Sequence, residues 1–357
     1  MSPLPLLQAP DWLRLLANLM ASAGETDASG GWPGESLSAL GRSGAYACFA
    51  PEHFGGQGGS ELDLLQLYEQ IAQANLTLAF ILTQRQGGMG RILVAENPAP
   101  RERWLAPLIS GEAFATVAIS HLTTSRRHVA SPILNAEETS NGFLLNGYSP
   151  WVTGGAFADV IVVGATFADG RQVLLAVPTD LPGVKAAASE KLVALTASHT
   201  GRVDFENVLV ERKWLLAGPV MEVMKQGLGA RTGGLPTSAL ALGLTGAALG
   251  YLEREGQQRD TLLAPLESLR EEHAALRQAL HTLAIGGEAC PTAEQVRVQA
   301  NSLVLRATQA ALVAAKGAGF ASSHPAGRWC REALFFLVWS CPQAVATANL
   351  CELAGLE

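Results

Sequence analysis

Apolar residues recur at helical spacing along the first third of the chain. The stretches DWLRLLANLM, which begins at Asp11, and ELDLLQLYEQIAQANLTLAFIL, which begins at Glu61, place them three or four positions apart. This spacing lines one buried face of a helix. Ser60 is a suitable N-cap for the second stretch, and the proline-rich AENPAPRERW introduces a third helix. The pattern predicts a helical domain over residues 1–113.

The pattern changes in residues 114–217, where short β-branched and aromatic runs alternate with turn residues. The runs are FATVAIS, GFLLNGYSPWVT, ADVIVVGATF, RQVLLAVP and RVDFENVLV. Asn141-Gly142, Asn146-Gly147 and Asp169-Gly170 have the residue types of tight hairpin turns. We expect a small antiparallel β domain here, either a barrel or a sandwich, between two helical parts.

Helical spacing returns in residues 218–357. The long helical segments are Pro236–Arg254, Leu262–Ile285 and Thr292–Ala315. Thr292 and Gln295 have the spacing of a capping box. In FFLVWSCPQA, Pro342 follows an apolar run, and because proline resists the helix interior, it predicts a break between two final helices. Four helices joined by short connections are typical of a bundle.

The composition narrows the class of protein. Of the 357 residues 48% are hydrophobic and 16% are charged, and the formal net charge is -7. Much apolar surface must therefore be buried in a core or in subunit interfaces. The acidic balance and the lack of basic runs longer than short pairs argue against nucleic-acid binding. The longest apolar run, Ser238–Leu252, is short for a membrane span and is predicted to be a buried helix.

The cysteines and the amino-terminal sequence bear on the cellular location. None of Cys330, Cys341 and Cys351 has CxxC spacing, so we expect buried thiols rather than zinc ligands or disulfides, and no metal site. The opening MSPLPLLQAPDW lacks the basic region of a secretory signal. A cytoplasmic location is the expectation.

Four segments, taken in their order along the chain, resemble the acyl-CoA dehydrogenase family. They are PEHFGGQGGSELDLLQLYEQIA, RERWLAPLISGEAFATVAIS, GFLLNGYSPWVTGGAFADVIVV and RVDFENVLVERKWLL. The resemblance extends from about Ala45 to Val345. It implies a mainly α fold with a central antiparallel β domain, in the order N-terminal helical domain, β-barrel or sandwich, and C-terminal four-helix bundle. It also implies FAD between the β domain and the bundle, a small-molecule substrate such as an acyl-CoA, and a homodimer or homotetramer.

The resemblance assigns a flavin platform to PWVTGG. Trp151 matches the residue that packs against the flavin ring, and Thr153 matches the one directed at the ring edge. Ser120, in AISHLTTSRR, matches a hydroxyl at the pyrimidine end of the ring. Small hydroxyl groups suit a ring edge that needs hydrogen bonds at close range. The alternative interpretation is that Trp151 belongs to the core and that the hydroxyls cap strands.

The same AISHLTTSRR segment departs from the family. His121 replaces a glutamate, and Arg126-Arg127 replace the Ser-Asp pair that lies near the coenzyme A arm. Arginine binds phosphate or carboxylate well, which makes Arg126 a candidate substrate-binding residue. The alternative is that these arginines are solvated loop residues. His121 and His199 are predicted to be structural histidines.

A second match concerns the ADP half of the cofactor. Arg259, in QQRDTLLAPLESLR, corresponds to an arginine that the family supplies from a neighbouring subunit, but Leu262 replaces the phenylalanine that follows it. KGAGF keeps Gly317 and Gly319, with Lys316 at the position of the family's first glycine. That lysine would lie near a pyrophosphate or fill the space that a glycine leaves free, and both interpretations stay open.

The third match concerns the catalytic base. GRWCREAL resembles the family's R..RDa element, and counting onward places Ser340 on the glutamate that takes the α-proton. Some members keep their base just before an arginine of an earlier helix. Arg231, a candidate substrate-binding residue, matches that arginine, and Ala230 precedes it. Neither location holds a carboxylate. A positioned base contributes roughly 10²–10⁴ in rate, which a serine hydroxyl does not supply, although Ser340 keeps the backbone N–H that polarises the thioester carbonyl.

Three functions follow from these matches. The whole-chain resemblance favours an FAD-dependent, acyl-CoA dehydrogenase-like oxidoreductase that acts on the CH–CH bond of an acyl thioester. A flavin-dependent monooxygenase on the same fold needs no carboxylate at Ser340. A catalytically inactive member would lack the base, with or without the flavin. The fold alone does not choose among them, because one fold supports many functions.

Overall fold

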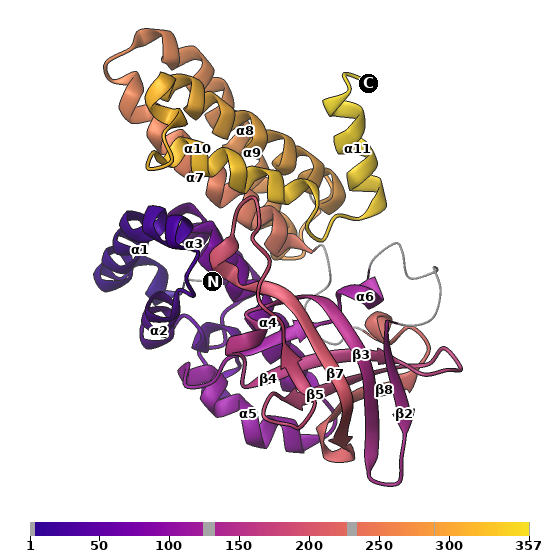
Figure 1. Ribbon diagram of the computed structural model, residues 1–357. Coiled ribbons are helices and arrows are strands. Elements are labelled where there is room, and N and C mark those ends of the chain that lie inside the picture. Colours follow the sequence, from indigo (N-terminus) through magenta and orange to yellow (C-terminus); the bar gives the residue numbers. More distant parts are fainter. Residues whose placement is uncertain (1–3, 124–132, 227–233, 289, 357) are drawn as a thin grey trace.

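A computed structural model describes residues 4–123, 133–226, 234–288 and 290–356 of the chain (Figure 1). The amino-terminal helices are α1 (Pro10–Ser29), α2 (Gly34–Arg42), α3 (Glu61–Ala74), α4 (Leu76–Val94) and α5 (Pro98–Ser110). They lie beside a twisted sheet, and a helical bundle lies above both in the view of Figure 1. The mainly α fold with a central, mostly antiparallel sheet is confirmed.

The helix that was expected from Glu61 onward is two helices. Ser60 caps α3 as predicted: its Oγ accepts a hydrogen bond from the Asp63 N–H at 3.2 Å, and the Asp63 carboxylate accepts one from the Ser60 N–H at 3.0 Å. At Asn75 the backbone becomes extended, with φ -159°, and the Asn75 Oδ1 accepts from the Leu78 N–H at 3.2 Å. The apolar spacing concealed this break because both helices bury the same kind of side chain.

The β domain forms one eight-stranded sheet. Its strands are β1 (Ala115–Ala118), β2 (Leu134–Glu138), β3 (Gly142–Thr153), β4 (Val160–Thr166), β5 (Gln172–Pro178), β6 (Val184–Ala186), β7 (Thr200–Glu211) and β8 (Leu215–Val220). The order is β6-β7-β3-β2-β4-β5-β8, and β1 pairs with β4. The β1–β4 and β2–β4 pairs are parallel, and β2, β6 and β8 were missed from the sequence. A short helix, α6 (Ser120–Thr123), follows β1.

Two of the three predicted hairpin turns are present. Asn141-Gly142 joins β2 to β3, and Asp169-Gly170 joins β4 to β5. Asn146-Gly147 instead lies inside β3, where the pairing register shifts. A Cβ atom on Gly147 would lie 2.1 Å from the Ile133 carbonyl oxygen. The glycine is therefore required for a close approach of two strands, and the prediction of a turn at this dipeptide was wrong.

The sheet buries both of its faces. Along β4, Val160 and Val162 belong to an apolar cluster shared with α4 and α5, whereas Ile161 and Val163 belong to a second cluster on the opposite face. This is the alternation that a strand imposes on its side chains. A third cluster is continuous through α1, α3, α4 and the carboxy-terminal bundle. The helical parts at the two ends of the chain thus share one core.

The carboxy-terminal bundle consists of α7 (Leu235–Gly256), α8 (Leu263–Ala284), α9 (Ala293–Ala315) and α10 (Pro325–Ala333) (Figure 1). Helix α11 (Gln343–Leu353) lies at one end of it and contacts α9, where Ser302 donates to Glu352. α7 is long and apolar enough to cross a membrane by length and composition, but 72% of the relevant window is buried inside the protein. A Cβ on Gly243 would lie 2.4 Å from the Glu69 carbonyl oxygen, so α7 and α3 pack closely. Cys330, Cys341 and Cys351 are free thiols and are half-buried, not buried as expected.

Candidate functional site

The FFLVWSCPQA stretch forms a corner between α10 and α11. A short 3₁₀ segment, Leu334–Leu337, follows α10, and Ser340 then adopts φ +46°. Trp339 stacks on Phe335, with ring centroids 4.9 Å apart, and meets the edge of Phe80 from α4 at 5.2 Å. The predicted helix break is present, and aromatic packing holds the residue that precedes Ser340.

Helix α9 supports this corner with two polar side chains. The Arg297 Nη2 donates to the Trp339 carbonyl oxygen at 3.1 Å, and the Asn301 Nδ2 donates to the Phe336 carbonyl oxygen at 3.1 Å. Arg297 is buried, which lowers its pKa to about 10, and it remains charged at neutral pH. Burial raises the pKa of the nearby Cys341 thiol, and Arg297 opposes this shift. The corner therefore has a rigid backbone and a positive charge beneath it.

The residues that match R..RDa serve the packing of α10. Glu332 is 3% exposed and lies 3.4 Å from the Arg328 Nε, and burial raises the pKa of its carboxyl group to about 7. Arg331 pairs with Asp27 of α1 at 2.5 Å and donates to the Val193 carbonyl oxygen at 3.1 Å. This motif thus ties α10 to α1 and to the connection between β6 and β7.

The structure brings the three residues of the predicted flavin platform to neighbouring elements, because α6 packs against β3. The Trp151 side chain is 52% exposed, so the interpretation of Trp151 as a core residue was wrong. The Ser120 Oγ is buried and has no hydrogen-bond partner among the described residues. Thr153 is buried, and its Oγ1 lies 2.9 Å from the Thr200 Oγ1. An open aromatic face and an orphaned hydroxyl fit the ring of a flavin, which needs both.

The residues that match the ADP half are arranged differently. The Arg259 Nη2 donates to the Ala314 carbonyl oxygen at 2.8 Å and pairs with Glu255, so this arginine is directed toward its own subunit. Gly317 is exposed, and a Cβ there would meet nothing within 4 Å. A Cβ on Gly319 would lie 2.6 Å from the Ala315 Cβ. Within this chain, the glycine is required at 319 and not at 317.

Lys316 occupies a backbone conformation that favours glycine, with φ +55° and ψ -147°. Non-glycine residues in such regions cost about 1–3 kcal/mol, whereas a glycine loses more entropy on folding, by roughly 0.5–1 kcal/mol. We expect Lys316→Gly to raise the free energy of unfolding by about 1 kcal/mol in urea titrations. The control is Ala318→Gly in the same turn, which has no such φ and should not stabilise. Equal or lower stability of Lys316→Gly would contradict the role of strain at this turn.

The remaining residues named from the sequence are two arginines and two histidines. Arg126 and Arg231 lie outside the described residues. The His121 Nε2 lies 2.7 Å from the Gly164 carbonyl oxygen, and burial lowers the pKa of its ring. The His199 Nε2 lies 3.1 Å from the Gly30 carbonyl oxygen. Both histidines make structural contacts, as expected.

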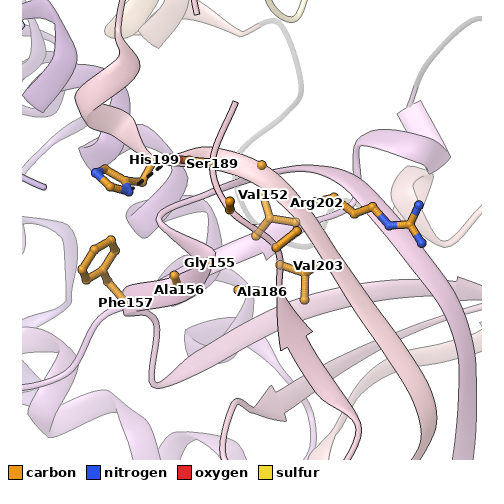
Figure 2. A pocket seen from close by; sticks show the side chains of 12 residues that line it. Val152, Gly155, Ala156, Phe157, Ala186, Ser189, His199, Arg202 and Val203 are labelled. Carbon is orange, nitrogen blue, oxygen red and sulfur yellow. Dashed lines mark hydrogen bonds between the residues drawn. The ribbon is translucent and has the colours of Figure 1, made fainter. Parts of the chain in front are cut away.

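A pocket of about 310 Å³ lies beside the predicted platform and was not anticipated (Figure 2). Val152, which alternates with Trp151 and Thr153 along β3, lines it together with Phe157 and His199. Phe157 stacks on Trp32 with centroids 4.5 Å apart. Figure 2 shows Phe157 and His199 close together at one side and the guanidinium of Arg202 directed away. The sequence did not predict this pocket, because segments far apart along the chain line it, within residues 152–157, 186–189 and 199–203.

Comparisons with known proteins agree with the architecture. The family model described as "Acyl-CoA dehydrogenase, N-terminal domain" matches residues 14–112. The mitochondrial isovaleryl-CoA dehydrogenase of Oryza sativa subsp. japonica is 27% identical over 308 residues, which cover 80% of this chain and 75% of that protein. The solved butyryl-CoA dehydrogenase of Megasphaera elsdenii superposes with a TM-score of 0.83 at 19% identity and 99% coverage of both chains. A glutaryl-CoA dehydrogenase of Mycobacterium smegmatis, solved with FADH2, gives a TM-score of 0.79 at 16% identity, over 98% of this chain and 96% of that chain.

The chain combines the order of helical domain, central sheet and bundle with an exposed tryptophan on β3. On α6, which packs against β3, it carries a buried hydroxyl that has no hydrogen-bond partner among the described residues. Residues 14–112 match the N-terminal domain of the acyl-CoA dehydrogenases, and the chain as a whole has the fold of solved acyl-CoA dehydrogenases.

Proposed function

We propose that this protein is a flavin-dependent, acyl-CoA dehydrogenase-like oxidoreductase whose substrate is a small acyl thioester. The sequence relative from Oryza sativa and the architecture both support this function. The single observation that carries it is the half-exposed Trp151 on β3 together with the buried Ser120 hydroxyl on the adjacent α6, which has no hydrogen-bond partner among the described residues. A bound flavin would accept a hydride from the β-carbon of the acyl group, which is the redox chemistry that the protein itself lacks.

We propose FAD as the form of the flavin. Ser120 would hydrogen-bond the pyrimidine end of the ring, Trp151 would cover one face, and Thr153 would be oriented by Thr200. Arg259 and Gly317 would lie near the ADP half, supplied by a neighbouring subunit. For this, Arg259 has to exchange its bond to the Ala314 carbonyl oxygen for one to a phosphate. The pairing of Arg259 within its own subunit predicts weaker binding of the ADP half than of the ring.

The proton step is where this chain differs from its family. Ser340 places a backbone N–H, but no carboxylate, at the corner between α10 and α11. The buried carboxylates Glu69 and Glu332 are both engaged in ion pairs in the helical core. The backbone N–H of Ser340 would therefore polarise the thioester carbonyl without a positioned base beside it. This position favours a second function, a flavin-dependent monooxygenase, which requires no α-proton abstraction by a carboxylate.

A homodimer or homotetramer is part of the proposal. Several large apolar side chains of the carboxy-terminal half are exposed in the single chain. They are Val313 at 76%, Phe320 at 89%, Val338 at 78%, Leu350 at 66% and Leu353 at 63%. We propose that a second copy of the chain buries these side chains, since apolar side chains gain stability when an interface removes them from water. Val313 precedes the Lys316–Phe320 turn and Phe320 ends it. Burial of these two side chains by a second copy would therefore bring that copy close to Gly317.

The visible absorption spectrum of the purified protein, before and after addition of FAD, tests the cofactor proposal. We expect stoichiometric flavin, and we expect Ser120→Ala to weaken its affinity about five-fold, because one neutral hydrogen bond contributes about 1 kcal/mol. Thr123→Ala, an exposed position on the same short helix, is the matched control and should bind flavin as the wild type does. Absence of bound flavin in the wild-type protein would overturn the proposal.

A further inference from the structure

A second pocket, of about 130 Å³, lies where α2, α4 and the connection between α5 and β1 meet. Trp32, Leu37, Tyr46, Arg85 and Phe114 are among the residues that line it. This pocket and the Ser340 corner use different faces of α4. Phe80 contacts Trp339 at the corner, whereas Arg85 follows five positions later and projects from another side of the helix. The pocket therefore lies away from the corner that holds Ser340.

Arg85 is a buried cation without an anionic partner. It is 0% exposed, and its Nη2 donates to the carbonyl oxygens of Leu108 and Ala113. In the part of the chain that the structure describes, its Nε and Nη1 have no hydrogen-bond partner, and it forms no ion pair with any carboxylate. Burial lowers its pKa to about 10, so the guanidinium keeps its charge at neutral pH.

The tyrosines around Arg85 do not act as its counter-ion. The guanidinium carbon lies 3.7 Å from the centroid of the Tyr46 ring, which gives a cation–π contact. The Tyr46 hydroxyl donates to the Leu37 carbonyl oxygen at 2.6 Å, and burial raises its pKa to about 12. Burial also raises the pKa of Tyr68. Both phenols are neutral at physiological pH, and an unpaired buried charge is strongly unfavourable.

We propose that this pocket binds a short-chain monocarboxylate, with its carboxylate on Arg85 and its alkyl part against Trp32, Leu37 and Phe114. Arginine suits carboxylates in partly apolar surroundings. The pocket also borders the first turns of α2, a nine-residue helix without a side-chain N-cap, and the amino-terminal end of a helix favours an anion. The small volume restricts the alkyl part to a few carbons.

A ligand in this pocket would lie at the junction between the amino-terminal helices and the β domain. Trp32 meets the Phe114 ring edge-on at 5.3 Å and stacks on Phe157 of the β domain. A ligand whose alkyl part packs against Trp32 would therefore stabilise the junction between the amino-terminal helices and the sheet. The inference does not depend on the proposed redox function, since it uses neither flavin nor Ser340.

Thermal unfolding of the full-length protein in sodium propionate, at constant ionic strength against sodium chloride, tests this site. We expect propionate to raise the melting temperature of the wild type by roughly 1–3 °C at a concentration well above its Kd. In Arg85→Met, this response should be lost. Without propionate, Arg85→Met should be at least as stable as the wild type, because a well-packed apolar side chain replaces an unpaired charge.

The matched control is Arg103→Met, which removes an exposed arginine stacked on the Trp104 ring, 4.6 Å from its centroid. This variant should keep the full response to propionate. Fluorine NMR of trifluoroacetate supplies a direct readout, with line broadening in the wild type and none in Arg85→Met. An equal response to chloride would overturn the carboxylate assignment. No response in the wild type, together with an Arg85→Met that is less stable in every buffer, would show a purely structural arginine and overturn the site.

Discussion

Ser340→Glu is expected to give exchange of the α-proton of an acyl thioester with solvent deuterium, at a rate roughly 10²–10⁴ above that of the wild type, because a positioned general base contributes about this factor. The structure offers the position without further rearrangement. The strained φ of +46° is already borne by a residue with a side chain, so glutamate adds no new backbone cost. Trp339, Arg297 and Asn301 hold the corner on either side.

The exchange is measured by mass spectrometry of the recovered thioester, with flavin content checked in parallel. Ser340→Gln is the matched control, since it has the size of glutamate without a basic carboxylate, and it should exchange no faster than the wild type. If flavin-loaded Ser340→Glu exchanges no faster than Ser340→Gln, the corner does not face the α-carbon. The assignment of Ser340 to the position of the base would then fail, while the flavin proposal would still stand on its own test.

Glu332→Gln is expected to remove a pH-dependent loss of stability. The folded-state pKa of Glu332 is raised by burial from 4.5 to about 7. Below pH 4.5 the carboxyl group is protonated in both states. Between about pH 4.5 and 7 the folded state keeps a proton that the unfolded state has lost, so the stability of the wild type falls as the pH rises through this window. The loss is on the order of 3 kcal/mol and is complete above about pH 7.

Urea titrations at a series of pH values between 4 and 8 measure this effect. The difference in the free energy of unfolding between Glu332→Gln and the wild type should grow in favour of the variant across the window. Glu271→Gln, at an exposed position of α8, is the control and should follow the wild type at every pH. A constant difference between Glu332→Gln and the wild type would mean that Glu332 is ionised throughout, as a full partner of Arg328.

Local chemistry explains the parts of the fold that the sequence predicted. The N-cap at Ser60, the capping box at Thr292 and the hairpin turn at Asp169-Gly170 need only neighbouring residues, and all are present. The predicted turn at Asn146-Gly147 failed because the same dipeptide also permits a close approach of strands inside a sheet. The short strands β2, β6 and β8 were missed because their pairing partners supply most of their stability.

For the candidate site too, the sequence predicted residue types, whereas the tertiary structure decided their contacts. Its residue types were readable from the sequence: the hydroxyls, the tryptophan, and the missing carboxylate at Ser340. The exposure of Trp151, the orphaned Ser120 hydroxyl and the pairing of Arg259 within its own subunit depend on which distant groups lie nearby. Neither pocket was visible in the sequence, because their walls combine residues from elements far apart along the chain.

By itself, the sequence determined the helical and β-rich regions and the resemblance to a family, since periodicity, turn chemistry and residue identity are local properties. Only the tertiary structure decided which polar groups are left without partners and which are already satisfied. Arg85 shows the difference: it is an ordinary helical residue in the sequence, and it becomes a charged, unpaired group only when α2, α4 and the start of the β domain enclose it. Burial and partnership are properties of the packed molecule, and they set the energy of a charge.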